Sequence, residues 1–183
     1  MMENGQEFPR LIEGLQYRLM YCEQPLLVAA LVVELVIDAC ARRTDEADKS
    51  LNTLEENSGL HRYNNRRKGN PVEMDFMNAI EILHFTSRTL GLDTLRLELI
   101  WPILRQVLND TKEITSQTID RSRELDSNAS PMAISDGLRM IEELFGYLHS
   151  TCENQLLRAK YEASRIQTQL TVVSIFSMNV ECC

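Results

Sequence analysis

Residues 131–173 read PMAISDGLRMIEELFGYLHSTCENQLLRAKYEASRIQTQLTVV, and the spacing of their apolar side chains decides the fold class. These side chains recur every three or four residues, which is the period of one face of an α-helix. A repeated interval of four, from Cys152 to Leu156, predicts a stutter in an otherwise heptad seam. The seam consists of Leu138, Ile141, Phe145, Leu148, Cys152, Leu156, Ala159, Ala163, Ile166, Leu170 and Val173.

The start of this helix is marked by SNASPM, residues 127–132, where Ser130 can cap the first turn and Pro131 suits the first helical position. We therefore expect a helical domain over 1–129, a coiled-coil-like stalk helix over 130–176 and a short tail over 177–183. An uncovered seam of this length would leave a larger apolar patch than monomers usually expose. It predicts either oligomerisation or folding back onto a helix at 94–126.

Upstream, the sequence predicts further long helices and no strands. A short helix is expected over 10–20, and a second begins at Pro25 and ends at the NSG of residues 57–59. A third runs to Gly91, and Asp93 is expected to cap a fourth, which Pro102 should kink or break. The fold class is therefore all-α, with long antiparallel helices and an extended C-terminal stalk helix.

Composition limits the classes of function. The net charge of −8 disfavours a nucleic-acid-binding protein, which would need a basic face. One basic stretch, HRYNNRRKGNP at 61–71, is interpreted as a solvated connection, with a phosphate or lipid-headgroup site as the alternative. Five scattered cysteines form no zinc or disulfide pattern, so a reducing cytoplasmic location is expected.

Motifs that would indicate an enzyme are absent from the sequence. It contains no dinucleotide, P-loop, nucleophile-elbow or metalloprotease pattern, and no cofactor is expected. His84 and His149 are interpreted as hydrogen-bonded structural residues, and Trp101 and the methionines as core side chains. The adjacent acidic pairs at 45–46, 55–56 and 142–143 are interpreted as solvated charges. We expect that the chain is not an enzyme.

Neither apolar run is long enough to cross a bilayer. The run from Pro25 to Cys40 is shorter than the roughly 20 residues that a membrane helix needs, and Glu34 and Asp38 interrupt it. The run LTVVSIFSMNV at 170–180 is shorter still. No membrane span is expected in this chain.

Two long segments resemble fungal CorA-like divalent-metal transporters. CEQPLLVAALVVELVIDACARRTDEADKSLNTLEENSGLH, residues 22–61, is similar to the family's cytosolic signature, and ENQLLRAKYEASRIQTQLTVV, residues 153–173, to its stalk helix. The resemblance covers most of the chain, from about Tyr21 to Val173. It implies an oligomer in which the stalk continues into a pore helix that carries magnesium or a related cation.

The resemblance also gives the tail a meaning. The family's pore helix ends in Gly-Met-Asn, and FSMN here is similar at Met178 and Asn179, with Ser177 in place of glycine. The phrase follows Val173 without the expected membrane helix, which suggests a lost internal segment; a chance tetrapeptide is the alternative. The chain should then not conduct ions alone, and the resemblance implies Mg²⁺ as a ligand or as the substrate of an ancestral transporter.

Two functions follow as expectations. The first is a truncated CorA-like transporter homologue that forms a homo-oligomer or assembles with an intact paralogue, and would then be membrane-associated. The second is a soluble helical scaffold or regulator that binds partners through the C-terminal seam. The interface expected in either case consists of Leu138, Ile141, Phe145, Leu148, Leu156, Ile166 and Leu170.

Overall fold

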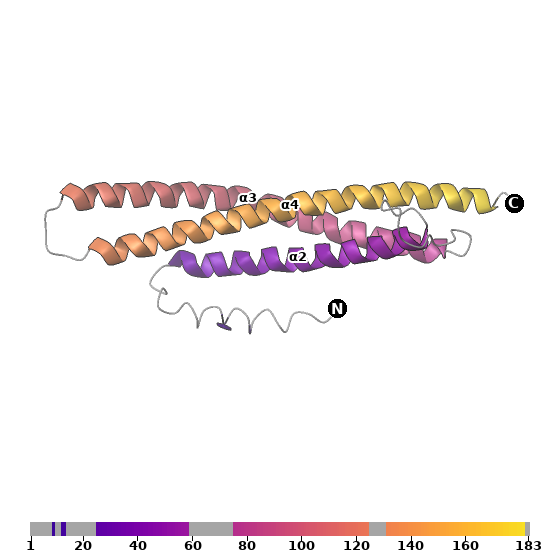
Figure 1. Cartoon of the computed structure of the whole chain (residues 1–183), viewed down its shortest axis with the longest axis horizontal. Coiled ribbons are helices and arrows are strands. Elements are labelled where there is room, and N and C mark those ends of the chain that lie inside the picture. Colours follow the sequence, from indigo (N-terminus) through magenta and orange to yellow (C-terminus); the bar gives the residue numbers. More distant parts are fainter. Residues whose placement is uncertain (1–8, 10–11, 14–24, 59–74, 125–130, 182–183) are drawn as a thin grey trace. The chain divides into compact units, whose positions relative to one another are not determined.

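Three long helices make up almost all of the protein that the computed structural model describes, namely residues 9, 12–13, 25–58, 75–124 and 131–181 (Figure 1). Helix α2 spans Pro25–Asn57, α3 spans Phe76–Glu124 and α4 spans Pro131–Glu181. The described residues contain no strand, so the all-α prediction is confirmed. The expected helix at 10–20 is described only at residues 12–13, which are helical, and the basic stretch at 61–71 lies outside the described residues.

Helix α2 has the bounds that the sequence predicted. Pro25 stands at its first position, where a backbone N–H would have no hydrogen-bond partner within the helix. At the other end, the Ser58 backbone N–H donates to the Leu54 carbonyl at 2.9 Å and closes the last turn. Helix α2 runs without a break from its largely apolar first half into its charged second half.

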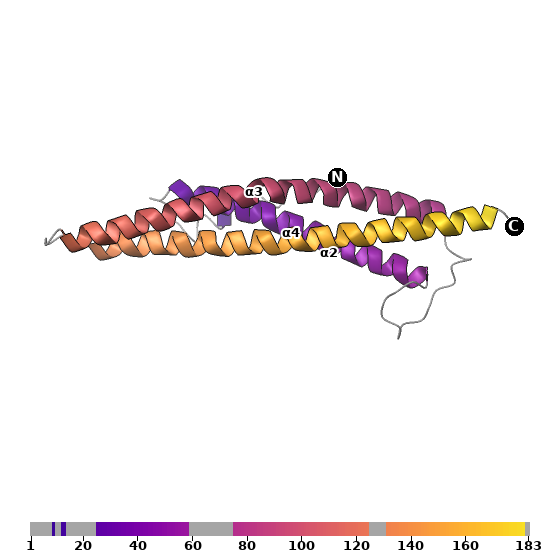
Figure 2. The ribbon, with the colours of Figure 1, turned by 90° about the horizontal axis from the view of Figure 1, so that it is seen from above.

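Helix α3 is longer than predicted, because the sequence placed a helix end at Gly91 and a new start at Asp93. The structure has one helix through both residues and through Pro102 (Figure 2), so the predicted end and restart are wrong. Gly91 is exposed and helical, with open space where a Cβ would lie. Asp93 is fully buried and binds arginine side chains instead of capping a helix.

The described chain divides into two compact units, and each helix contributes to both. Unit 1 contains Met1–Ala39 and Leu97–Asn154, and unit 2 contains Cys40–Arg96 and Gln155–Cys183. Within unit 1, the Cys152 thiol contacts the Leu97 carbonyl oxygen at 3.6 Å, so α4 folds back onto α3 there, one of the two outcomes expected for the seam. The buried apolar side chains of unit 1 include Leu27, Leu31, Ile37, Leu104, Ile141, Phe145 and Leu148.

Unit 2 has its own core, formed by all three helices. Successive ion pairs join Asp45 to Arg158 and Asp48 to Arg165, so α2 and α4 run in the same direction in this unit, with α3 antiparallel to both (Figures 1 and 2). The buried members of the core are Ala47, Leu51, Leu54, Ala79, Leu83, Leu90, Ile166 and Val173.

Polar side chains occupy part of the inner face of α4. Between Ala159 and Val173, the buried positions alternate by three and four residues and include Glu162 and Gln169. The apolar residues one position later, Ala163 and Leu170, are only partly buried. The sequence pattern therefore placed two inner positions one residue too late, because it selected apolar side chains where the fold buries polar ones.

Candidate functional site

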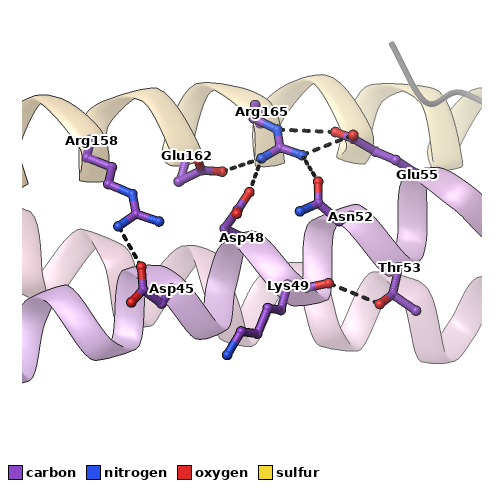
Figure 3. A network of polar contacts seen from close by, with 9 residues as sticks. All are labelled: Asp45, Asp48, Lys49, Asn52, Thr53, Glu55, Arg158, Glu162 and Arg165. Carbon is purple, nitrogen blue, oxygen red and sulfur yellow. Dashed lines mark hydrogen bonds and ion pairs between the residues drawn. The ribbon is translucent and has the colours of Figure 1, made fainter. Parts of the chain in front are cut away.

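The main polar site of the described structure lies in unit 2, where Arg165 of α4 points toward α2 (Figure 3). Its Nε donates to Glu55 at 3.3 Å, and its Nη2 donates to Glu55 at 3.0 Å and to Asn52 at 2.9 Å. Its Nη1 donates to Asp48 at 2.6 Å and to Glu162 at 2.8 Å. These five bonds equal the five N–H donors of a guanidinium, so Arg165 has no donor left for another ligand.

Helical spacing explains why these acceptors converge. Asp48, Asn52 and Glu55 are separated by four and three residues, so they lie on one stripe of α2 that faces α4. Glu162 lies one turn before Arg165 on α4 and completes the shell. The site is thus built from two helices whose relative register it fixes.

The charges of this site are unbalanced, since three carboxylates surround one guanidinium. The side chain of Glu162 is only 4% exposed. Burial raises its pKa above the ordinary glutamate value; Arg165 opposes the change and Asp48 adds to it. Burial alone would lower the pKa of Arg165, but its bonds to Glu55 and Asp48 and the charge of Glu162 raise it above the ordinary value. Arg165 is therefore a permanent cation in a negative surrounding.

A second ion pair of unit 2 lies one heptad earlier on α4 and is more exposed. Arg158 binds Asp45 at 2.5 Å, with 39% and 49% of the two side chains exposed. Arg158 also lies four residues before Glu162, which is the spacing of a helical ion pair, but the Glu162 carboxylate binds Arg165. The interpretation of residues 55–56 as solvated charges is wrong for Glu55, which is buried against Arg165.

A third polar cluster of unit 2 surrounds Asp93 of α3. Arg43 donates to both oxygens of Asp93 at 2.7 Å, and Arg96 donates at 2.8 Å, so a fully buried carboxylate has two cationic partners. Arg43 also donates to the Cys40 sulfur at 3.6 Å. Burial, followed by the charge of Asp93, raises the pKa of the Cys40 thiol to about 11. This thiol is therefore protonated at neutral pH and unsuited to nucleophilic chemistry.

Unit 1 contains an aromatic cluster beside an arginine side chain. The rings of Trp101 and His149 lie with centroids 5.3 Å apart, and the Arg105 guanidinium lies 5.6 Å from the Trp101 ring. Trp101 Nε1 and His149 Nε2 are buried without a hydrogen-bond partner among the described residues. The expected hydrogen-bonded role of His149 is therefore not seen at Nε2, and His84, the other helical histidine, is exposed.

Four of the seven predicted interface residues are buried on the inner side of α4 within a single chain. Ile141, Phe145, Leu148 and Ile166 are buried. Leu156 and Leu170 are partly buried, and the side chain of Leu138 lies outside the part of the chain that is described. A second molecule therefore reaches these four buried side chains only if the helices separate, and the role of the seam between molecules stays a prediction.

The predicted ion-filter residues belong to the last turns of α4. Met178 and Asn179 fall within Pro131–Glu181, and their side chains lie outside the described set. The helix continues through Val173 and Ser174, where the Ser174 hydroxyl donates to the Leu170 carbonyl at 2.7 Å. Among the described side chains, no three of the His, Cys, Asp or Glu type are arranged to hold a metal ion.

The residue that organises the site was not singled out from the sequence. Arg165 stood within the stalk-like segment, and the complementary signal was the spacing of Asp48, Asn52 and Glu55 on α2. That stripe runs beside the apolar one formed by Ala47, Leu51 and Leu54, so its acceptors had to face a neighbouring helix.

None of the described helices contains a segment that is long and apolar enough to cross a membrane. The chain matches no protein-family model, no curated protein and no solved structure.

Proposed function

We propose that this chain is a helical scaffold of a CorA-like divalent-cation transport system, in which α4 acts as the stalk and binds subunits without carrying ions itself. The observation that carries the proposal is the Arg165 network, which fixes α4 against α2 through four hydrogen bonds. The segment that resembles the family's stalk, residues 153–173, is the segment of α4 that contains Arg158 and Arg165.

The way in which the charged residues are used supports a structural role. The carboxylates of Asp48, Glu55 and Glu162 bind Arg165, and that of Asp93 binds Arg43 and Arg96. Buried pairs of this kind specify which helices pack together and in which register, although their net effect on stability is small. A stalk needs such a register, because a displacement of the helix would otherwise be absorbed by sliding.

The experiment is a co-purification with an intact CorA-like protein from the same genome. A tagged chain should recover that protein from detergent extracts, and Gln167→Pro should abolish recovery, because proline in a helix interior breaks the helix. Gln167→Ala is the matched control, since Gln167 is exposed and alanine keeps the helix. Failure of the intact chain to recover the transporter would contradict the proposal.

A flux measurement tests the other half of the proposal. Purified chain reconstituted into liposomes should give no Mg²⁺ uptake above that of protein-free vesicles, because conduction needs apolar helices around a ring of coordinating oxygens. Mg²⁺ uptake by the chain alone would overturn the proposal. Binding to a protein outside the transport system, with no recovery of the transporter, would instead favour the general scaffold or regulator.

A further inference from the structure

The outer face of α3 in unit 2 carries exposed side chains in an ordered pattern. Met77, Phe85 and Leu92 are exposed, with Met77 78% and Phe85 73% accessible. Glu81 and Arg88 are also exposed, and neither forms an ion pair with another described residue. This finding corrects the sequence-based interpretation of Met77 as a core side chain.

The five residues form one continuous row. Their successive separations are four, four, three and four residues, so they follow a single stripe along the helix. The order is apolar, acidic, aromatic, basic, apolar, and Phe85 stands between the two opposite charges. Three exposed apolar side chains aligned in one row with two charges form a candidate surface for a helical partner.

We propose that this face binds a second copy of the chain, with the two α3 helices antiparallel and the two-fold axis between residues 84 and 85. In this register Glu81 of each copy lies opposite Arg88 of the other, and Met77 lies opposite Leu92. The two Phe85 rings meet beside the axis. In this one register, each charged residue faces a residue of opposite charge and each outer apolar residue faces another apolar residue.

Charge decides between this arrangement and the parallel one. Parallel helices in register would place Glu81 opposite Glu81 and Arg88 opposite Arg88, and like charges across a helix interface are unfavourable. Antiparallel pairing makes both contacts attractive, and a two-fold interface forms each contact twice. A pairing of this size along one helix should be weak and dependent on concentration.

Charge reversal of the full chain tests the pairing by sedimentation at about 100 μM, where a weak interface of this size is populated. Glu81→Arg and Arg88→Glu should each weaken dimerisation at least about tenfold, because each places like charges at both symmetric contacts. The double variant Glu81→Arg/Arg88→Glu should dimerise like the original chain. An equimolar mixture of the two single variants should form a heterodimer, since all of its contacts are again complementary.

Cysteine cross-linking tests the register independently. In a chain with Cys22, Cys182 and Cys183 replaced by serine, His84→Cys should form an intermolecular disulfide, because the two positions differ by one residue, about 1.5 Å, along the axis. Asn78→Cys is the matched control and should not cross-link, since its two copies are 13 residues, about 20 Å, apart. Both substituted residues are exposed, and an unchanged helix content by circular dichroism will show that the variants fold.

Three results would overturn the proposal. A chain that is monomeric at every concentration would assign the face to another segment of the same chain or to solvent. A dimer that Phe85→Glu and the charge variants leave unchanged would place the interface elsewhere. Equal cross-linking at positions 78 and 84 would indicate parallel helices. None of these results would affect recovery of a transporter through α4, so this inference and the proposed function fail separately.

Discussion

At the scale of single residues, buried charges define the structure. Arg165 uses all five of its donors, and Asp93 is fully buried between two arginines. Neither arrangement follows from hydrophobic periodicity, because a pattern search treats charged side chains as outward-facing. Glu162 is the clearest case, since it occupies an inner position next to Ala163, which the pattern preferred.

Glu162 makes stability depend on pH in a defined direction. Because its native pKa lies above the ordinary value of 4.5, Glu162 stays protonated to a higher pH in the native state than in the unfolded state. Its contribution to stability is therefore complete below pH 4.5 and is lost as the pH rises through the native pKa. Glu162→Gln should gain stability relative to the original chain between pH 4 and pH 7.5, measured as the difference between their melting temperatures.

Glu153→Gln, on the exposed side of the same helix, is the control for this pH series and should show a smaller change with pH. The melting-temperature difference between Glu162→Gln and the original chain should change with pH in this direction. A difference that stays constant, or that changes in the opposite direction, would contradict the conclusion that burial raises the pKa of Glu162.

The Cys40 thiol should be inert in the folded chain. Its pKa of about 11, against an ordinary value of 9.0, lowers the thiolate fraction at pH 8 about a hundredfold, and burial slows access further. Alkylation followed by peptide mass spectrometry should show Cys40 reacting at least a hundred times more slowly in native protein than in urea. Equal rates in the two conditions would mean that α2 and α3 do not enclose this residue.

At the scale of elements, local signals predicted some helix limits and missed others. Pro25 and the residues after Asn57 marked both ends of α2 correctly, since a proline start and a glycine-containing end act locally. Gly91 and Asp93 gave a false boundary in α3, because burial and the two arginines hold Asp93 inside a continuous helix. Partners that are distant in sequence, such as Arg43, cannot be deduced from the residues around Asp93.

The continuity of α3 gives a prediction with a clear sign. Gly91→Ala should increase the free energy of unfolding by about 0.5–1 kcal/mol, because alanine favours a helix interior over glycine and its Cβ meets nothing within 4 Å. Urea denaturation followed by circular dichroism measures the change. Gly146→Ala in α4 is the matched control and should behave alike. A loss of stability for Gly91→Ala alone would indicate that α3 ends at Gly91.

At the scale of the whole molecule, the sequence was sufficient to predict the all-α fold class but not to predict which side chains are in contact. Long helices followed from apolar periodicity and from the scarcity of glycine and proline. Which side chains face one another depended on helix pairing. The side chains of Phe145 and Leu148, expected at an interface between molecules, are buried within the chain, whereas Met77 and Phe85 are exposed. The sites proposed here therefore depend on the three-dimensional arrangement.

The central claim is that the Arg165 network holds α4 against α2, and a double-mutant cycle tests it most directly. Urea unfolding of Arg165→Met, Glu55→Gln and the double variant should give a coupling energy of at least about 1.5 kcal/mol, because residues of one buried network do not act additively. The same cycle for Arg158→Met and Asp45→Asn should give less than about 0.5 kcal/mol, since that pair is exposed and screened by water. Additive effects of Arg165→Met and Glu55→Gln would contradict the claim, and a large coupling confined to Arg158 and Asp45 would transfer the role to the outer pair.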